Sequence, residues 1–423
     1  MPFLETCHRL ELPPVATYAG VVLWNWKPLF PDEPVDNLEN LMTLTTFTGS
    51  LDESWFYLVS VAIEARAAPA IPMMLDAIAA ARCDDSAAVT ECLRAFAEIL
   101  DELGSMLQRM YENCDPHVFY HRIRPFLAGS KNMADAGLPN GVIFDTGSGH
   151  DDYVQFAGGS NAQSSVIQFF DLVLGVEHRP TGTKPTVESH RSTTAGRHPH
   201  ADGPAPPSNN FIQDMRRYMP GPHRRFLEHV GRIASIKEYV STRRHNRALV
   251  TAFDACLAML RTFRDKHIQM VSRYIIVKSR ESRSDSRSMS PREHQENRNS
   301  FSSGTYSKPI PQRVNLATGS SVKQGMASDN LSHGHPAAAA LAAAKKLRGT
   351  GGTALIPFLK QARDETGEPA IDAWARRLLN NGPADGPGAR LSMMDEHADG
   401  GIAMVGLAGV WSVDDSEGGI CHW

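Results

Sequence analysis

Residues 247–277 read RALVTAFDACLAMLRTFRDKHIQMVSRYIIV, and this stretch decides the fold. Large apolar residues recur in it at alternating intervals of three and four positions, which is the spacing along one face of an α-helix. The seam comprises Phe253, Cys256, Leu260, Phe263, His267, Met270 and Tyr274. The stretch therefore predicts one long helix with a dry face, and it is the longest helical pattern in the chain.

Helical periodicity also dominates the rest of the chain. The predicted helices cover residues 52–71, 71–81, 87–110, 117–127, 163–174, 211–219 and 222–230. In the fourth of these, Pro125 disfavours a helical conformation at the preceding residue, so we expect Arg124 at a kink or an end. No series of alternating strands and no internal repeat is present. The sequence therefore predicts an all-α fold.

Composition divides the chain into packed and unpacked parts. Residues 181–210, 279–342 and 381–423 are poor in large apolar residues and rich in Ser, Gly, Pro and Arg. Such segments bury too little apolar surface to offset the entropy of ordering the chain. We expect one large helical domain, residues 1–278 plus 343–380, with a disordered insertion at 181–210, a Ser/Arg-rich disordered insertion at 279–342 and a flexible tail at 381–423. The Ser/Arg tract reads as a solvated linker, with an RNA-binding or phosphorylated segment as the alternative.

Charge and cysteine content exclude several classes of protein. The 423 residues carry a net charge of −4, which favours neither a nucleic acid nor an anionic membrane as partner. No apolar run reaches the roughly 18 residues of a membrane helix, and no secretion signal is recognisable. The six cysteines are scattered without a C-x-x-C pair, which argues against a zinc finger or a disulfide scaffold. We expect a cytoplasmic protein.

His267 is the residue in the seam that carries chemistry. An imidazole among dry residues needs a hydrogen-bond partner or a metal ion. The spacing alone favours a core histidine with a hydrogen bond. No second histidine or carboxylate lies three or four positions away, as a zinc site on one helix would require. If a metal is bound, one axial histidine with an apolar wall suits haem better than zinc.

Four motifs together carry a family resemblance. They are GGSNAQSSVIQFFD at 158–171, FIQDMRRYMP at 211–220, HIQMV at 267–271 followed by Tyr274 and Ile275, and GTGGT at 349–353. In this order they resemble the indoleamine 2,3-dioxygenase family, and the match runs through most of residues 10–178, 211–278 and 348–365. The resemblance favours His267 as a ligand over the core reading.

The resemblance implies a haem b enzyme that acts on L-tryptophan and O₂. It would insert both oxygen atoms across the indole 2,3 bond and give N-formylkynurenine, the first step of the kynurenine route towards NAD. His267 would be the proximal ligand to iron. The haem environment would include Asp171, Arg264 and Ala162. An ordinary interhelical salt bridge is the alternative for the pair Asp171 and Arg264.

The resemblance also assigns a substrate pocket. Its catalytic residues would be Ser60, Phe119 and Arg124, and its substrate-binding residues Tyr18, Val21, Val22, Phe56, Tyr120, Ser160, Asn161 and Thr350. Arg124 would bind the amino-acid carboxylate, and Tyr120 stands where the family has Phe. Tyr120 and Arg124 are four positions apart, so a helix would present both on one side. We expect no general base in this pocket, because the cofactor performs the difficult step.

Two further expectations concern the loop at 349–352 and the partners. Three glycines in four residues suit a mobile lid over the pocket that brings Thr350 to the substrate, with a plain turn before a helix as the alternative. We expect a monomer that needs an electron donor to keep the iron ferrous.

Two other functional classes remain open at this point. The family's small N-terminal domain precedes the motif LELPP, which here lies at residues 10–14. A haem-binding but catalytically impaired or sensory protein is therefore the first alternative. A helical interaction protein that recruits partners through its Ser/Arg tract is the second.

Overall fold

A computed structural model describes most of the predicted helical domain. The described residues are 2–131, 133–134, 137–147, 152–182, 210–280, 349–351 and 354–380, together with the backbone of four short strands between 314 and 412. Most of the three segments predicted to be disordered lies outside these residues. The prediction of disorder is not tested there.

The α-helices are α1 (Pro2–Arg9), α2 (Leu51–Ala67), α3 (Ala70–Arg82), α4 (Ser86–Gln108), α5 (Met110–Asn113), α6 (Pro116–Val118), α7 (Ser165–Leu174), α8 (Phe211–Met215), α9 (Gly221–Ile233), α10 (Ile236–Thr242), α11 (Arg247–Val271), α12 (Lys278–Arg280), α14 (Leu355–Thr366) and α15 (Ala373–Asn380). Shorter 3-10 and π turns are η1 (Ala19–Leu23), η2 (Leu38–Asn40), η3 (Phe119–Ile123), η4 (Arg124–Leu127), η6 (Asn161–Gln163), η7 (Arg216–Tyr218) and η8 (Ser272–Val277). The strands are β1 (Trp26–Pro28), β2 (Leu41–Thr43), β3 (Val314–Asn315), β4 (Ser320–Ser321), β5 (Ala403–Gly406) and β6 (Gly409–Ser412).

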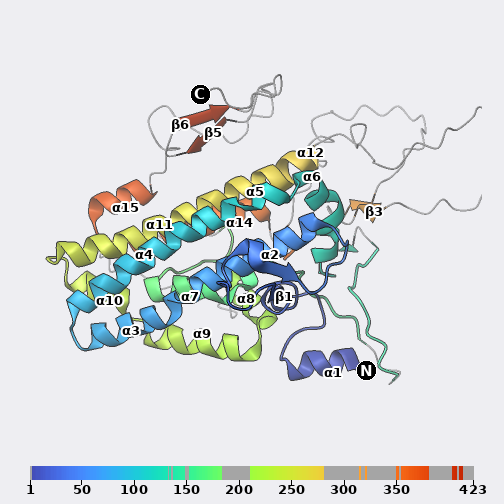
Figure 1. Ribbon diagram of the computed structural model, residues 1–423, viewed down its shortest axis with the longest axis horizontal. Coiled ribbons are helices and arrows are strands. Elements are labelled where there is room, and N and C mark those ends of the chain that lie inside the picture. The colour runs from blue at the N-terminus through green and yellow to red at the C-terminus, as the bar shows by residue number, and fades with distance from the viewer. Residues whose placement is uncertain are drawn as a thin grey trace, which may run out of the picture.

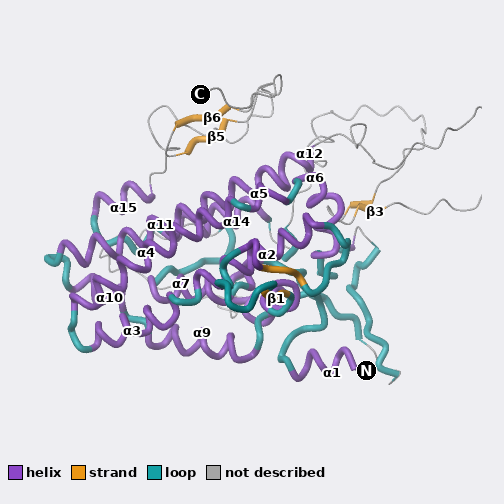
Figure 2. The backbone as a smooth tube through the Cα atoms, viewed as in Figure 1, coloured by secondary structure: helices purple, strands orange, loops and turns teal. Residues whose placement is uncertain are grey.

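The all-α prediction is confirmed. Strands form only three antiparallel pairs, β1–β2, β3–β4 and β5–β6, among the described residues, and Figure 2 shows how little of the chain they occupy. The last two pairs fall inside segments whose composition predicted no packed structure. Helices α1 and α10 were not predicted, because each is too short to show a clear apolar period. α2 begins after Ser50, whose hydroxyl accepts a hydrogen bond from the Glu53 amide and so caps the helix.

The core is built on the parallel pair α4 and α11, since Leu93 meets Cys256 near their starts and Gly104 meets Lys266 near their ends. They pack along most of their length, and Figure 1 shows them side by side along the long axis of the molecule. The residues of α4 that were expected at helix spacing, Leu93, Phe96, Leu100 and Leu103, are at most 1% exposed. α2 and α3 pack on α4, and α14 packs on α11. The cysteine in the α11 seam, Cys256, donates its Sγ hydrogen to the Leu93 carbonyl at 3.0 Å.

The helical stretch Leu51–Arg82, formed by α2 and α3, is long and apolar enough to cross a membrane by length and composition. This differs from the expectation that no run reaches that length. Half of the most apolar part of this stretch is buried inside the fold, and both helices pack on α4. Core packing therefore explains why the stretch is so apolar.

The expected helix end next to Arg124 is confirmed. The π turn η3 ends at Ile123, and the 3-10 turn η4 begins at Arg124, directly before Pro125. The seam of α11 also continues beyond the α-helix, because η8 keeps Tyr274 buried at 3% exposure. Both features place side chains at one end of the molecule's core.

Replacing Leu93 with alanine tests the importance of the α4–α11 contact. Leu93 is fully buried, so we expect Leu93→Ala to lower the free energy of unfolding by about 2–5 kcal/mol. Urea unfolding followed by circular dichroism measures this change. The matched control is Leu51→Ala at the start of α2, where the side chain is 83% exposed and the change should stay within about 0.5 kcal/mol. Equal losses in the two variants would contradict the proposed core.

Candidate functional site

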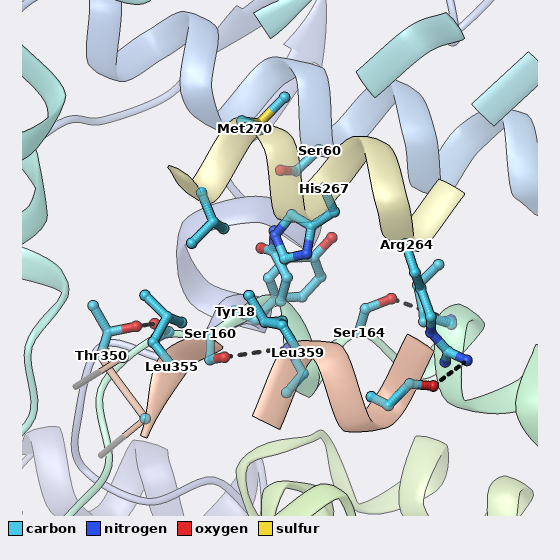
Figure 3. Close-up of a pocket in the computed structure, with 18 of the residues that line it drawn as sticks. Tyr18, Ser60, Ser160, Ser164, Arg264, His267, Met270, Thr350, Leu355 and Leu359 are labelled. Atoms are coloured by element: carbon cyan, nitrogen blue, oxygen red, sulfur yellow. Dashed lines mark hydrogen bonds between the residues drawn. The ribbon is translucent and has the colours of Figure 1, made fainter. Parts of the chain in front are cut away.

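One cavity lies where α2, α7, α11 and α14 meet η3, η4 and the loop tip at 349–351. Its wall is mainly apolar and aromatic, and a few polar side chains point into it. Figure 3 shows His267 and Arg264 projecting from α11 toward α14, with Thr350 and Ser160 at the opposite end. The cavity therefore joins segments that lie up to 344 positions apart, from Tyr18 to Ala362.

The structure brings most of the predicted site residues to this cavity. The predicted site residues that line it are Tyr18, Phe56, Ser60, Phe119, Arg124, Ser160, Asn161, Ala162, Asp171, Arg264, His267 and Thr350. Val21, Val22 and Tyr120 are not among the residues that line it. The structure shows where these residues lie, and their roles remain predictions.

The three exceptions have local causes. The π turn η1 directs Val22 into the core, where it is 2% exposed, and Val21 packs against the same core. Tyr120 is 2% exposed and lies beneath Arg124, whose Cζ is 5.6 Å from the centre of the ring. The expected pairing of Tyr120 with Arg124 is therefore present, but Tyr120 supports the guanidinium from behind and does not contact the cavity.

The imidazole of His267 faces the cavity. Among the residues that the structure describes, no hydrogen-bond partner is found for either ring nitrogen, and no group of three or more His, Cys, Asp or Glu side chains is placed to hold a metal ion. Burial, together with the charge of Arg264, lowers the pKa of His267 to about 4. The ring is therefore neutral at physiological pH and keeps a free lone pair. One neutral imidazole without companions fits a metal that brings its other ligands with it, as haem iron does.

Arg264 and Asp171 form the interhelical ion pair that the sequence left as the alternative. Arg264 Nη2 donates to both carboxylate oxygens of Asp171, at 2.7 and 2.8 Å, and Nη1 donates to Thr366 Oγ1 and to the Ala362 carbonyl. Burial alone would raise the pKa of Asp171, but Arg264 and His178 outweigh it and hold that pKa below its ordinary value. The pair thus ties α7, α11 and α14 together at the cavity wall.

The aromatic part of the wall comes from α2 and η3. The rings of Phe56 and Phe119 lie 4.8 Å apart between centroids, and Phe119 also contacts Tyr274 edge-on at 5.6 Å. Ser60 follows Phe56 by one helical turn and turns its hydroxyl back to the Phe56 carbonyl at 3.4 Å. Arg124 is only 4% exposed, and burial lowers the pKa of its guanidinium. A flat ring with an attached anion would find apolar faces and a buried cation here.

Glu64 is a cavity residue that the sequence analysis missed. It lies one turn after Ser60 on α2, and its Oε1 accepts hydrogen bonds from Tyr18 Oη at 2.9 Å and Ser164 Oγ at 2.6 Å. Burial raises the pKa of this carboxyl group, against the effect of the two hydrogen bonds. The cavity wall therefore contains a carboxyl group, and the expectation that no general base acts there stays a prediction. Its position four residues after Ser60, on the same face of α2, was the signal that could have found it.

The loop tip at 349–351 is docked on the segment that precedes η6. Thr350 Oγ1 donates to the Gly159 carbonyl at 2.6 Å, and the Gly158 amide donates to the Thr350 carbonyl at 3.1 Å. Position 158 requires glycine, because a Cβ there would lie 2.0 Å from the Leu127 carbonyl oxygen. Gly352 and Thr353 lie outside the described residues, and the mobile-lid hypothesis remains a prediction.

Comparison with known proteins gives a consistent result. A family model described as indoleamine 2,3-dioxygenase matches residues 1–369. The chain is 39% identical over 371 residues to the indoleamine 2,3-dioxygenase of Saccharomyces cerevisiae, a match that covers 86% of this chain and 70% of that protein. It is 38% identical to the 6-hydroxytryptophan 2,3-dioxygenase of Fusarium equiseti, with coverage of 66% and 61%. It is 32% identical to indoleamine 2,3-dioxygenase 1 of Mus musculus, with coverage of 67% and 63%. The last two matches therefore span less than two thirds of the relative's length.

Exchanging Glu64 for glutamine tests the state of the buried carboxyl group. A raised pKa in the folded protein means that stability falls as the pH rises above the ordinary value of 4.5. Glutamine keeps an acceptor for Tyr18 and Ser164 but cannot ionise. We expect Glu64→Gln to be more stable than the wild type at pH 8 and of equal stability at pH 4, measured by urea unfolding. A variant that is less stable than the wild type only at pH 8 would show that the ionised form is the favoured one.

Proposed function

The chain belongs to the indoleamine 2,3-dioxygenase family, and from this membership we propose that it is a haem-dependent oxidoreductase that acts on L-tryptophan. Members of this family are tryptophan or indole 2,3-dioxygenases. The proposed reaction adds both atoms of O₂ across the indole 2,3 bond and gives N-formylkynurenine, which begins the kynurenine route towards NAD. The observation that carries the proposal is the neutral imidazole of His267, which faces a largely apolar cavity without a protein partner among the described residues.

The cofactor would be held by α11 and the segments packed on it. His267 would bind the iron through the lone pair that its lowered pKa leaves free. Arg264 and Asp171 would lie at the cofactor's edge and Ala162 beside it, since all three line the same cavity. Haem iron, when bound, supplies the activation of O₂, which no side chain can perform.

The chain's own residues would bind and orient the substrate. Arg124 is a buried cation whose planar guanidinium suits a carboxylate, and Tyr120 supports it from behind. Phe56 and Phe119 offer ring faces to an indole, with Ser60 one turn away on α2. Fixing the amino-acid end and the ring at separate points would restrict the orientation of the reacting bond, which is a large part of what a protein contributes to such a reaction.

The remaining polar groups would complete the binding site. Ser160, Asn161 and Thr350 line the cavity at the end where the loop tip docks. Glu64 would keep Tyr18 and Ser164 in place through its two hydrogen bonds. We also expect the enzyme to be a cytoplasmic monomer with an electron donor that keeps the iron ferrous.

Turnover under labelled oxygen tests the proposed function. Purified protein loaded with haem is given L-tryptophan, a reductant and ¹⁸O₂, and the product is analysed by mass spectrometry. We expect N-formylkynurenine with both oxygen atoms derived from ¹⁸O₂. Haem binding without product would instead indicate a catalytically impaired or sensory protein, and absence of haem binding would contradict the proposal.

Replacing His267 with alanine removes the proposed iron ligand. We expect His267→Ala to lose stable haem binding, seen as loss of the Soret band after removal of free haem, because no other imidazole lines the cavity among the described residues. His229→Ala is the matched control, since His229 is an exposed histidine on α9 and should leave the spectrum unchanged. A full haem load and normal turnover in His267→Ala would refute the assignment.

Replacing Arg124 with alanine tests carboxylate recognition. A charged hydrogen bond of this kind is worth about 1.5–3 kcal/mol, so kcat/KM for tryptophan should fall roughly 10- to 150-fold in Arg124→Ala. The loss should be much smaller for tryptamine, which lacks the carboxylate. The exposed Arg217 on η7 provides the control variant Arg217→Ala. An equal fall in kcat/KM for tryptophan and for tryptamine would contradict the assignment.

A further inference from the structure

A buried chain of charged side chains links three elements of the cavity wall. His178 Nε2 lies 3.1 Å from Asp171 Oδ2, and His178 Nδ1 lies 2.7 Å from Glu365 Oε2. Asp171 in turn binds Arg264, as described above. The side chains of His178, Asp171 and Glu365 are 6%, 6% and 2% exposed. None of the proposed functional roles uses His178 or Glu365, and the sequence analysis named neither.

Local structure explains how His178 reaches this position. α7 ends at Gly175, which has φ +65° and ψ +33°, the left-handed conformation that terminates many helices. The chain reverses there, so that His178 lies against Asp171 on the last turn of the same helix. Glu365 arrives from α14, 187 positions later, and its Oε1 also accepts from the Arg179 amide at 3.1 Å and from Gln361 Nε2 at 2.8 Å.

The geometry requires a protonated ring. A neutral imidazole donates through one nitrogen only, and the other nitrogen presents a lone pair. Each nitrogen of His178 faces an oxygen of a different carboxylate. In a neutral ring, the lone pair of one nitrogen would therefore point at a lone pair of a carboxylate oxygen, unless that carboxyl group were itself protonated. The imidazolium donates to both. The two carboxylates, Arg264 and His178 then sum to zero charge, which a buried cluster favours.

Other charges surround this cluster. Arg179 lies beside Glu365 and pairs with Glu368 of α14, and Glu177 acts on Arg179 through its charge. The positive charge of Arg216 on η7 interacts with the negative charge of Asp171. The positive charge of Arg264 on α11 lowers the pKa of His178. Arg179 is 30% exposed and Glu368 37%, so solvent weakens their influence. The two buried carboxylates are the closest charges to the ring.

The cluster is adjacent to the cavity. Asp171 and Arg264 line it, and Arg264 lies one turn before His267 on α11. α14, which His178 ties to α7 through Glu365, contributes Leu355, Phe358 and Leu359 to the same wall. Figure 3 shows Leu355 and Leu359 of α14 opposite His267 and Arg264. Breaking either link of His178 would leave Arg264 as the remaining connection between α7 and α14 at this wall.

We propose that His178, as an imidazolium held between Asp171 and Glu365, is a positioning residue that fixes Arg264 and α14 around the cofactor and makes cofactor retention weaken as the pH rises. The cofactor part of this inference rests on the proposed function. The contacts of His178 with Asp171 and Glu365, which together form a latch between α7 and α14, do not rest on the proposed function, because they lie within the chain.

The direction of the pH dependence follows from the charges. Burial opposes a charge on the ring, but Asp171 and Glu365 outweigh it, so the pKa of His178 is raised above 6.5. A group with a raised pKa stabilises the folded state fully below its unfolded pKa and loses that contribution as the pH rises through the folded value. Glu365 has a lowered pKa, because hydrogen bonds from His178, Gln361 and the Arg179 amide outweigh its burial, so its contribution is lost only in acid. The latch is therefore complete below the ordinary histidine pKa of 6.5 and weakens as the pH rises above it.

The test measures the rate of haem release from the full chain between pH 6 and 9, by transfer to excess apomyoglobin. We expect the wild type to release haem several-fold faster at the upper end of this range than at the lower. His178→Gln should release haem at the fast rate throughout. The matched control His223→Gln changes another partly buried histidine, bonded to Ser165 Oγ outside the cluster, and should follow the wild type. The proposal would be overturned if the rate of haem release from the wild type did not change with pH. It would also be overturned if His178→Gln showed the same pH dependence as the wild type.

Glu365→Gln tests the protonation argument even if His178→Gln fails to fold. The glutamine amide can donate to His178 Nδ1 while its oxygen keeps the bonds from Arg179 and Gln361, so a neutral ring satisfies both neighbours. We expect Glu365→Gln to release haem slowly at every pH in this range. A pH profile like that of the wild type would contradict the inference.

A second readout separates this inference from the proposed function. Urea unfolding of the haem-free chain should show the wild type losing stability between pH 6 and 9, whereas Glu365→Gln and His178→Gln should not. If the chain binds no haem, the proposed function fails, but these unfolding curves still test the latch. Parallel pH dependence in all variants would show that the cluster has no such role.

Discussion

The α11 helix meets two demands with a single seam of side chains. From Phe253 to Leu260 the seam is completely buried against the core, and from Phe263 onward it forms the wall of a cavity. The close packing of α4 on α11 holds the first part rigid. His267 therefore projects from a fixed helix into open space, and the other cavity residues are arranged around it by α2, α7 and α14.

Buried charges account for much of the remaining organisation. Three of the carboxylates lie near the cavity and are satisfied by partners outside their own helices: Glu64 by Tyr18 and Ser164, Asp171 by Arg264 and His178, and Glu365 by His178. Breaking one partner of such a group is costly, because the other stays buried without compensation. These contacts join segments that the hydrophobic core alone would leave adjacent but free to slide.

The fold and most of the cavity could be predicted from the sequence, and the reasons differ. Helical periodicity is local, so the seam of α11 and the kink at Arg124 were readable directly. The cavity residues came from motifs that resemble one family, which is why Thr350 could be assigned to the same pocket as Ser160 and Asn161, although it lies about 190 positions later in the chain. Val21, Val22 and Tyr120 do not line the cavity, because a resemblance assigns positions and does not show which way a π turn directs each side chain. His178 and Glu365 could not be found, since neither stands in a periodic pattern and their pairing depends on the tertiary fold.

The central claim is that His267 provides the sole protein ligand to a haem in the cavity between α11 and α14. An absorption spectrum of the purified chain, taken after haem addition and removal of the excess in the ferric and ferrous–CO states, tests it most directly. We expect one haem per chain, with a Soret band that shifts on CO binding, as expected for an iron with one histidine ligand and an open position. A chain that retains no haem, or a ferrous haem that fails to bind CO because a second side chain occupies the iron, would contradict the account.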